Sequence, residues 1–175
     1  MKTLILIVVA IVVILALVVA VVALIGSRLP VAHTASRSIV VHQSPQQVYE
    51  VIRDFASAPT WRSDLKSVEV QNQPNGKIHF REHGSQGTVN YELVEDSPAQ
   101  RIVTRILDTD LGYSGKWTYV FTPEANGTRV TITEDGEVSN VIFRFMSRYV
   151  FGDTATMDSY LTSLAKRFGE DVKPS

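Results

Sequence analysis

The sequence predicts an α+β protein in which a curved antiparallel sheet of about seven strands wraps around a long C-terminal helix, behind one transmembrane helix. Three observations support this prediction. Residues 4–25 carry no polar side chain. Residues 65–134 alternate between apolar and polar side chains, which is the period of a strand. Residues 140–169 space their apolar side chains three or four apart, which is the period of a helix.

The N-terminal segment is predicted to be a membrane anchor. At about 1.5 Å per residue, a helix over residues 4–25 matches a hydrocarbon core of roughly 30 Å. Gly26, Arg28 and Pro30 end the apolar run. A cleaved signal peptide is the alternative, with a small-residue cleavage site at 31–35. Signal cores usually run about 7 to 15 residues, so the length of this run favours an uncleaved anchor over residues 1–28.

This organisation predicts a single-pass protein of the bacterial inner membrane. Residues 29–35 would be a tether, and residues 36–175 would form one domain of ordinary size. The side of the membrane stays open, because Lys2 lies on one side of the apolar run while Arg28 and Arg37 lie on the other.

Charge and cysteine content restrict the function. The net charge is −1, and it falls to −3 when Lys2 and Arg28 are removed. Nucleic-acid-binding faces are strongly basic, so no nucleic-acid partner is expected. The sequence has no cysteine, which excludes disulfides, thiolate metal sites and cysteine nucleophiles.

The domain is predicted to begin with a strand and a helix. Residues 38–42 are short and rich in β-branched side chains, as in a strand. Ser44, Pro45 and Gln47 then form a helix start, with Ser44 as N-cap and Gln47 completing a capping box. This helix should end near Asp54, because Pro59 imposes an extended backbone on the residue before it.

The alternating region is predicted to be an antiparallel meander. Turn signals, among them Asn75-Gly76 and Asn126-Gly127, separate its strands. The strands are predicted at residues 65–71, 77–83, 88–95, 101–108, 115–122 and 128–134.

Alternation also assigns the two faces of the sheet. The concave face should carry Ile78, Phe80, Glu82, Val89, Tyr91, Leu93, Ile102, Thr104, Ile106, Trp117, Tyr119, Phe121, Val130, Ile132 and Glu134. The solvated face should carry Lys77, His79, Arg81, His83, Asn90, Glu92, Arg129, Thr131 and Thr133.

The C-terminal helix is expected to have two halves. Met157, Leu161, Leu164 and Phe168 form one apolar stripe that should pack on the sheet. The first half, residues 141–151, is almost entirely apolar and should be covered on most sides. A kink or break is expected at residues 152–154, which begin with a glycine.

With this order of elements, the chain resembles the START-like helix-grip superfamily (SRPBCC), and within it the polyketide cyclase/dehydrase and lipid transport branch. The resemblance covers roughly residues 36–170. Its motifs are Ser44-Pro45-x-x-Val48-Tyr49-x-x-Ile52 with Trp61, Gly115-x-Trp117-x-Tyr119-x-Phe121-x-Pro123, Gly127-Thr128-x-Val130-x-Ile132-Thr133-Glu134, and the C-terminal helix to Gly169. It implies a helix-grip fold and a hydrophobic cavity between sheet and helix for apolar or amphipathic small molecules. It implies no particular reaction.

The expected function is therefore membrane-tethered binding of a lipid or other hydrophobic small molecule. The alternative is a polyketide cyclase or dehydratase that uses a cavity Glu or Tyr as acid or base, and a third possibility is an interaction domain with a filled core. No catalytic residue is assigned. The expected ligand-binding residues are Trp61, Phe80, Tyr91, Thr104, Trp117, Tyr119, Glu134, Phe145, Met146 and Tyr149. Among them, Phe145, Met146 and Tyr149 are expected to gate the cavity.

Two carboxylates should point toward the apolar side, where an unpaired charge is costly. Glu82 and Glu134 are expected to pair with Arg144 or Arg148, or to lie at strand ends. Their functional alternative is a general base or a ligand anchor.

No cofactor and no metal are expected. His79 and His83 share one face of a strand, but that face is the solvated one and no further ligands converge on it.

Overall fold

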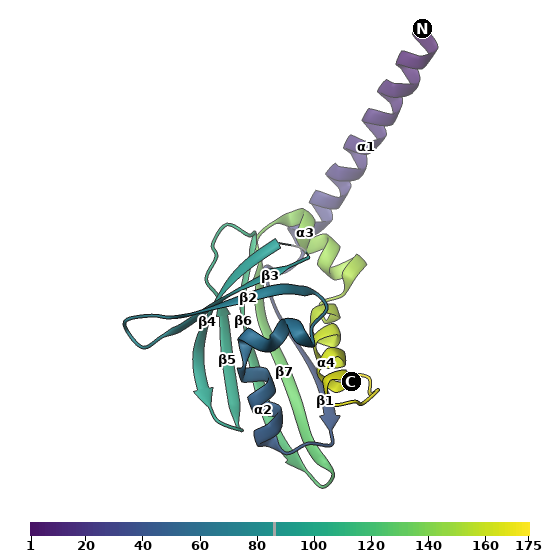
Figure 1. Cartoon of the computed structure of the whole chain (residues 1–175). Coiled ribbons are helices and arrows are strands. Elements are labelled where there is room, and N and C mark those ends of the chain that lie inside the picture. The colour runs from purple at the N-terminus through teal and green to yellow at the C-terminus, as the bar shows by residue number, and fades with distance from the viewer. Residues whose placement is uncertain (86) are drawn as a thin grey trace.

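The computed structural model describes residues 1–85 and 87–175. α1 (Lys2–Arg28) extends away from a folded body built on one curved sheet (Figure 1). Its apolar side chains are exposed along almost all of the helix, and its mean hydropathy reaches 3.8. The helix is therefore long and apolar enough to cross a membrane, a property that signal sequences near an N-terminus share.

The sheet has seven strands in the order β1-β7-β6-β5-β4-β3-β2, and every neighbouring pair is antiparallel. The strands are β1 (Ala32–Val41), β2 (Leu65–Asn72), β3 (Ile78–Gly84), β4 (Gly87–Ser97), β5 (Arg101–Ile106), β6 (Tyr113–Glu124) and β7 (Gly127–Val138). β2 to β7 form a meander, and β1 returns to pair with β7. The predicted sheet is confirmed.

The first strand is longer than the sequence predicts. It begins at Ala32, which lies opposite Glu137, rather than at Ser38. The reason is non-local: β7 continues to Val138 and offers a pairing partner to residues 32–37. The predicted tether at 29–35 is therefore wrong in length, because only residues 29–31 separate α1 from β1.

α2 (Pro45–Arg53) begins as its sequence predicts. The Ser44 side chain accepts a hydrogen bond from the Gln47 backbone N–H, and the Gln47 side chain accepts one from the Ser44 backbone. A 3₁₀ helix, η1 (Phe55–Thr60), follows and leads the chain to Trp61 at the edge of the core.

The C-terminal region is divided into separate helical segments. α3 (Val141–Met146) continues into a π-helical turn, η2 (Ser147–Phe151), and α4 (Ala155–Arg167) follows. Gly152 lies between η2 and α4 with φ 81°, in the left-handed region that favours glycine. The expected break is confirmed, and it separates two helices rather than bending one.

The core lies between the concave face of the sheet and the helices α2 and α4. Met157, Leu161 and Leu164 of α4 are completely buried, as are Ile102 and Ile132 of the sheet. Burial of a side chain of this size contributes about 1.5–3 kcal/mol. The predicted concave face is thus confirmed for its central residues, and the predicted packing stripe of α4 is confirmed as well.

Glu92 departs from the prediction for the opposite face, which was expected to be solvated. Its carboxylate is buried beneath the side chains of Lys77 and Arg105, which approach it to 2.6 Å and 2.7 Å. Hydrogen bonds from these two cations lower the pKa of Glu92. Long basic side chains can cover a carboxylate in this way while their own charges stay in water.

Candidate functional site

The aromatic side chains of the concave face converge on Tyr160 of α4. The Tyr160 ring centroid lies 5.3 Å from that of Trp61, 5.9 Å from Trp117 and 5.6 Å from Tyr119. Tyr119 and Tyr160 are buried, whereas the two tryptophans are half-buried. The curved sheet and α4 thus bring together rings from three distant parts of the sequence.

A second aromatic stack extends from this cluster along β3 and β4. The Phe80 ring lies 5.0 Å from Tyr91 and 4.1 Å from Phe55, with both pairs nearly parallel. Phe80 and Tyr91 are opposite each other in the register of β3 and β4, so the pleat alone places them on one face.

A buried ion pair lies within the aromatic cluster. Arg62 Nη1 lies 2.7 Å from Glu82 Oε1 and its Nη2 lies 3.3 Å from Oε2, while Nη2 also lies 2.7 Å from Asp64 Oδ2. The guanidinium carbon lies 5.1 Å from the Tyr160 ring centroid, a cation–π contact. Burial raises the pKa of Glu82, and the nearby Arg62 charge opposes that rise.

This ion pair corrects the prediction for Glu82. Its partner is Arg62 rather than Arg144 or Arg148. Arg62 lies between η1 and β2, in a connection whose contacts the sequence pattern alone does not indicate.

The tyrosine hydroxyls of the cluster remain protonated at neutral pH. Burial raises the pKa of Tyr91, Tyr119 and Tyr160 well above the ordinary value, and the charge of Glu82 adds to the rise in each case. Such hydroxyls can donate a hydrogen bond to a ligand, but they are poor general bases.

The indole N–H of Trp61 is buried and has no hydrogen-bond partner. Leaving a buried donor unpaired costs about 1–3 kcal/mol, so such groups are rare and call for an explanation. The Trp61 ring lies against Tyr160, beside the Arg62–Glu82 pair. A hydrogen-bond acceptor placed here would satisfy the donor.

Glu134 lies elsewhere on the concave face, opposite Trp117 in the register of β6 and β7. Its Oε1 lies 3.5 Å from Nε2 of His33 on β1. Burial raises the pKa of Glu134, whereas His33 and the Trp117 indole N–H act to lower it.

The predicted arginine partner of Glu134 is also wrong. Arg148 pairs with Asp153 at 3.1 Å, and Arg144 donates to backbone carbonyls. His33 reaches Glu134 because β1 extends further along β7 than the sequence predicts.

A pocket of about 540 Å³ lies under α3 and η2. Its walls come from the loop before β6, from β6 and from the two helical segments, and they are mostly apolar. The lining residues are Leu111, Tyr113, Asn140, Ile142, Phe143, Met146 and Phe151. Tyr113 stacks on Phe143, with the two ring centroids 5.7 Å apart.

A second pocket of about 300 Å³ lies on the opposite face of β3 and β4. It is lined by polar residues such as His79, Arg81 and Asp108, and Arg81 donates to Asn90 at 2.7 Å. Phe80 and Leu107 add apolar surface to this lining.

The predicted site residues fall into two groups. Trp61, Phe80, Tyr91, Thr104, Trp117, Tyr119 and Glu134 all lie on or beside the concave face. Of the predicted gate, Met146 lines the pocket under α3, while Phe145 packs on Tyr149 at 5.1 Å and Tyr149 is 60% exposed.

Sequence reasoning missed several residues of this region. Arg62 was not predicted because no periodic pattern marks it, and Tyr160 is not among the ligand-binding residues that the sequence predicts. Phe143 and Phe151 belong to a half-helix that was expected to be covered, and their exposure depends on how α3 sits against the body.

Within residues 1–85 and 87–175, no three His, Cys, Asp or Glu side chains come close enough to hold a metal ion. His83 has local partners, since its ring nitrogens lie 3.0 Å from Thr88 and 3.3 Å from Glu69.

The fold has many relatives among solved structures. A START superfamily protein from Mycobacterium smegmatis shares 16% identity and a TM-score of 0.61, over 77% of this chain and 96% of that one. The di-domain ARO/CYC StfQ from the steffimycin biosynthetic pathway shares 15% identity and a TM-score of 0.61, over 79% of this chain. The match spans about half of StfQ, 53% of its length. The Zhui aromatase/cyclase from a Streptomyces species shares 15% identity and a TM-score of 0.58, over 78% of this chain and 96% of that one.

These identities are low, so the likenesses establish the fold and not an activity. None of the curated proteins matches the chain. The sequence profile of one family, polyketide cyclase / dehydrase and lipid transport, matches residues 32–169, which span the body from β1 to the end of α4. With its START-like fold, the chain therefore belongs to the polyketide cyclase / dehydrase and lipid transport family.

Proposed function

We propose that this protein binds a hydrophobic molecule with one polar group, such as a lipid, and that α1 anchors it in a membrane. The polar group would meet the cluster around Trp61, Arg62 and Tyr160. The apolar part would extend along the concave face toward the pocket under α3. A largely apolar site with a few placed polar groups is typical of small-molecule binding.

The unpaired indole N–H of Trp61 carries this proposal. A ligand oxygen that accepts from Trp61 would remove the cost of the unpaired donor. The neighbouring guanidinium of Arg62 is bound by two carboxylates, those of Glu82 and Asp64, so a neutral acceptor such as a carbonyl or hydroxyl oxygen suits this place better than a carboxylate or phosphate.

The proposed membrane anchoring rests on α1. An uncleaved anchor would keep the domain close to lipid and would raise the effective concentration of a membrane-derived ligand. Cleavage as a signal sequence would release the domain, so the length of the mature chain, measured by intact-protein mass spectrometry, decides between the two.

Catalysis is not proposed, because no observation favours it. In the part of the chain that the structure describes, Glu82 is held by Arg62 and the cluster tyrosines have raised pKa values. These groups do not provide a free acid beside a free base.

The test is native mass spectrometry of the full chain released from membranes, followed by identification of the bound molecules. We expect a retained lipid or another apolar molecule. Trp61→Phe should weaken its retention by about three- to tenfold, the equivalent of one hydrogen bond. Trp117→Phe is the matched control, because its indole N–H faces Glu134. Absence of any bound apolar molecule, or equal loss in the two variants, would overturn the proposal.

A further inference from the structure

The end of α1 is joined rigidly to α3. The Arg144 side chain of α3 is 9% exposed and donates to four backbone carbonyls. Two of them belong to Gly26 and Leu29 at the end of α1, at 3.2 Å and 2.9 Å. The other two belong to Val138 and Ser139, at 2.9 Å and 3.1 Å. The guanidinium thus connects the last turn of α1 to the end of β7.

The backbones of α1 and α3 also touch directly. A Cβ atom added to Gly26 would lie 1.9 Å from the Val141 carbonyl oxygen, so only glycine permits this approach. The connection to β1 is short as well, because only residues 29–31 separate the two elements. The orientation of the body relative to α1 is therefore fixed by contacts and not by a flexible tether.

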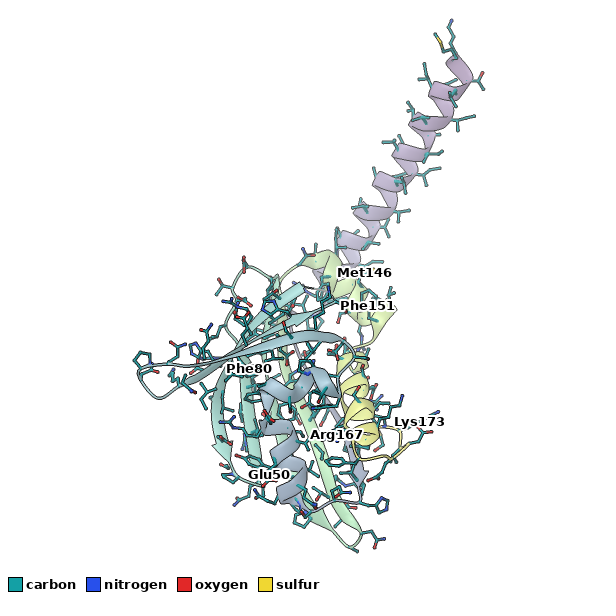
Figure 2. All side chains as sticks on the ribbon, viewed as in Figure 1. Glu50, Phe80, Met146, Phe151, Arg167 and Lys173 are labelled. Carbon is teal, nitrogen blue, oxygen red and sulfur yellow. The ribbon has the colours of Figure 1, made fainter. Side chains whose placement is uncertain are left out.

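This geometry places α3 and η2 at the height where α1 leaves the apolar region. Ile25 is the last residue of the apolar run, and Gly26, the next residue, is the one that touches Val141. If residues 4–25 cross the hydrocarbon core, α3 lies at the level of the lipid headgroups. Figure 2 shows Met146 and Phe151 at the end of the body that joins α1, with Glu50 at the opposite end.

The surface of α3 and η2 has the composition of a membrane interface. Five large side chains are 42–60% exposed, and three of them are aromatic: Ile142, Phe143, Tyr149, Val150 and Phe151. Arg28 and Arg148 add exposed cations nearby. Aromatic rings and basic side chains are enriched where a protein meets lipid headgroups.

We infer that the surface formed by Ile142, Phe143, Tyr149, Val150 and Phe151 inserts into the headgroup region of the same bilayer that holds α1. The pocket of about 540 Å³ shares Ile142, Phe143 and Phe151 with this surface. Insertion would therefore open that pocket onto lipid rather than onto water. This inference rests on the proposed anchoring by α1. It adds a fixed orientation of the body relative to the membrane and an entrance to the pocket that faces lipid.

Single-cysteine labelling tests the inference without interference, because the chain has no cysteine of its own. Val150→Cys probes the η2 surface, Val13→Cys probes α1, and Val120→Cys is the matched control. Val120 is 38% exposed on β6, seven residues past Tyr113, which is about 23 Å along the strand. Each full-length variant carries an environment-sensitive fluorophore and is reconstituted into phosphatidylcholine vesicles that contain lipids with quenchers near the headgroup or deep in the chains.

We expect deep quenchers to act on position 13, headgroup-level quenchers to act on position 150, and neither to act on position 120. If no lipid quencher acts on position 13, the membrane anchor itself is rejected. If lipid quenchers act on position 13 but quench position 150 no more than position 120, only the insertion of α3 and η2 is rejected.

A second pair of variants tests the role of Arg144. In the Val150→Cys background, Arg144→Met removes the contacts to Gly26 and Leu29 and should reduce headgroup-level quenching several-fold. Arg167→Met removes an exposed arginine in the last turn of α4, outside the surface of α3 and η2, and it should leave the quenching unchanged. Equal quenching in the two variants would show that Arg144 does not orient the body.

Discussion

The protein around Glu134 favours the protonated form of its carboxyl group. Burial raises its pKa in the folded state, and the opposing effects of His33 and Trp117 are smaller than that of burial. The folded protein thus binds this proton more tightly than the unfolded chain does. The stability from this group is present below the unfolded pKa and is lost as the pH rises through the folded pKa.

Glu134→Gln should therefore raise the melting temperature of the full chain at pH 7 and have little effect near pH 4, because glutamine carries no charge to bury. Thermal unfolding in detergent, followed by tryptophan fluorescence at both pH values, measures this. Glu137→Gln, on the same strand but exposed, is the control. A Glu134→Gln variant that melts below the original protein at pH 7 would indicate that the His33 contact outweighs the burial cost.

Leu161 and Phe145 represent two different roles in the C-terminal region. Leu161 is completely buried, so Leu161→Ala should cost about 2–5 kcal/mol of unfolding free energy. Phe145 is only partly buried, packs on exposed Tyr149 and precedes Met146, which lines the pocket under α3, so Phe145→Ala should change ligand capacity more than stability. Denaturation and lipid retention measured on both variants, with Lys166→Ala as an exposed control, would separate the roles. The reverse pattern would contradict this division.

At the scale of elements, α3 is attached to α1 more closely than to the sheet. Arg144 contributes to this attachment through its planar guanidinium, which donates both to the end of α1 and to the end of β7. A lysine at this position carries the same charge but cannot reach four carbonyls. The stability of α3 should therefore depend on the guanidinium and not on the charge alone.

Arg144→Lys should accelerate amide hydrogen exchange in α3 and at the end of α1, by tenfold or more if about 1.5–3 kcal/mol of local stability is lost. α4 provides an internal control, because Gly152 separates it from α3 and its side chains pack on the sheet. Hydrogen exchange with mass spectrometry measures both segments in one sample. Equal acceleration in α4 would point to global destabilisation instead.

In the molecule as a whole, β1 forms one edge of the sheet and pairs with β7 along its full length. Its first residues, from Ala32, lie opposite β7 residues up to Glu137. Removing them would expose the backbone groups of the β7 edge and would also remove His33 from Glu134. The part of the chain that forms the body therefore begins near residue 30 and not at residue 36.

A fragment of residues 30–175 should accordingly be more stable than a fragment of residues 36–175, with a higher melting temperature and less aggregation. Circular dichroism and light scattering of the two fragments under the same conditions test this. Identical melting temperatures would mean that the first half of β1 contributes nothing to the stability of the body.

The local features of this protein follow from its sequence alone. Alternation located β2 to β7, Asn-Gly pairs located two of the hairpins, Ser44 and Gln47 located the start of α2, and the unbroken apolar run located α1. Each feature depends on residues that are neighbours in the chain. Alternation also assigned the concave face, and with it most of the aromatic cluster, because successive side chains of a strand point to opposite faces.

Which distant residues meet depends on the tertiary structure. It paired Glu82 with Arg62 and Glu134 with His33, and it directed Arg144 to the carbonyls of α1. It also left the apolar surface of α3 and η2 uncovered, where the sequence indicated burial. The spacing of apolar residues shows that burial of a surface is favourable, but it does not show whether protein or lipid covers that surface. That depends on how the elements pack, and here the contact between Gly26 and Val141 places α3 beside the end of the apolar run, residues 4–25 (Figure 1).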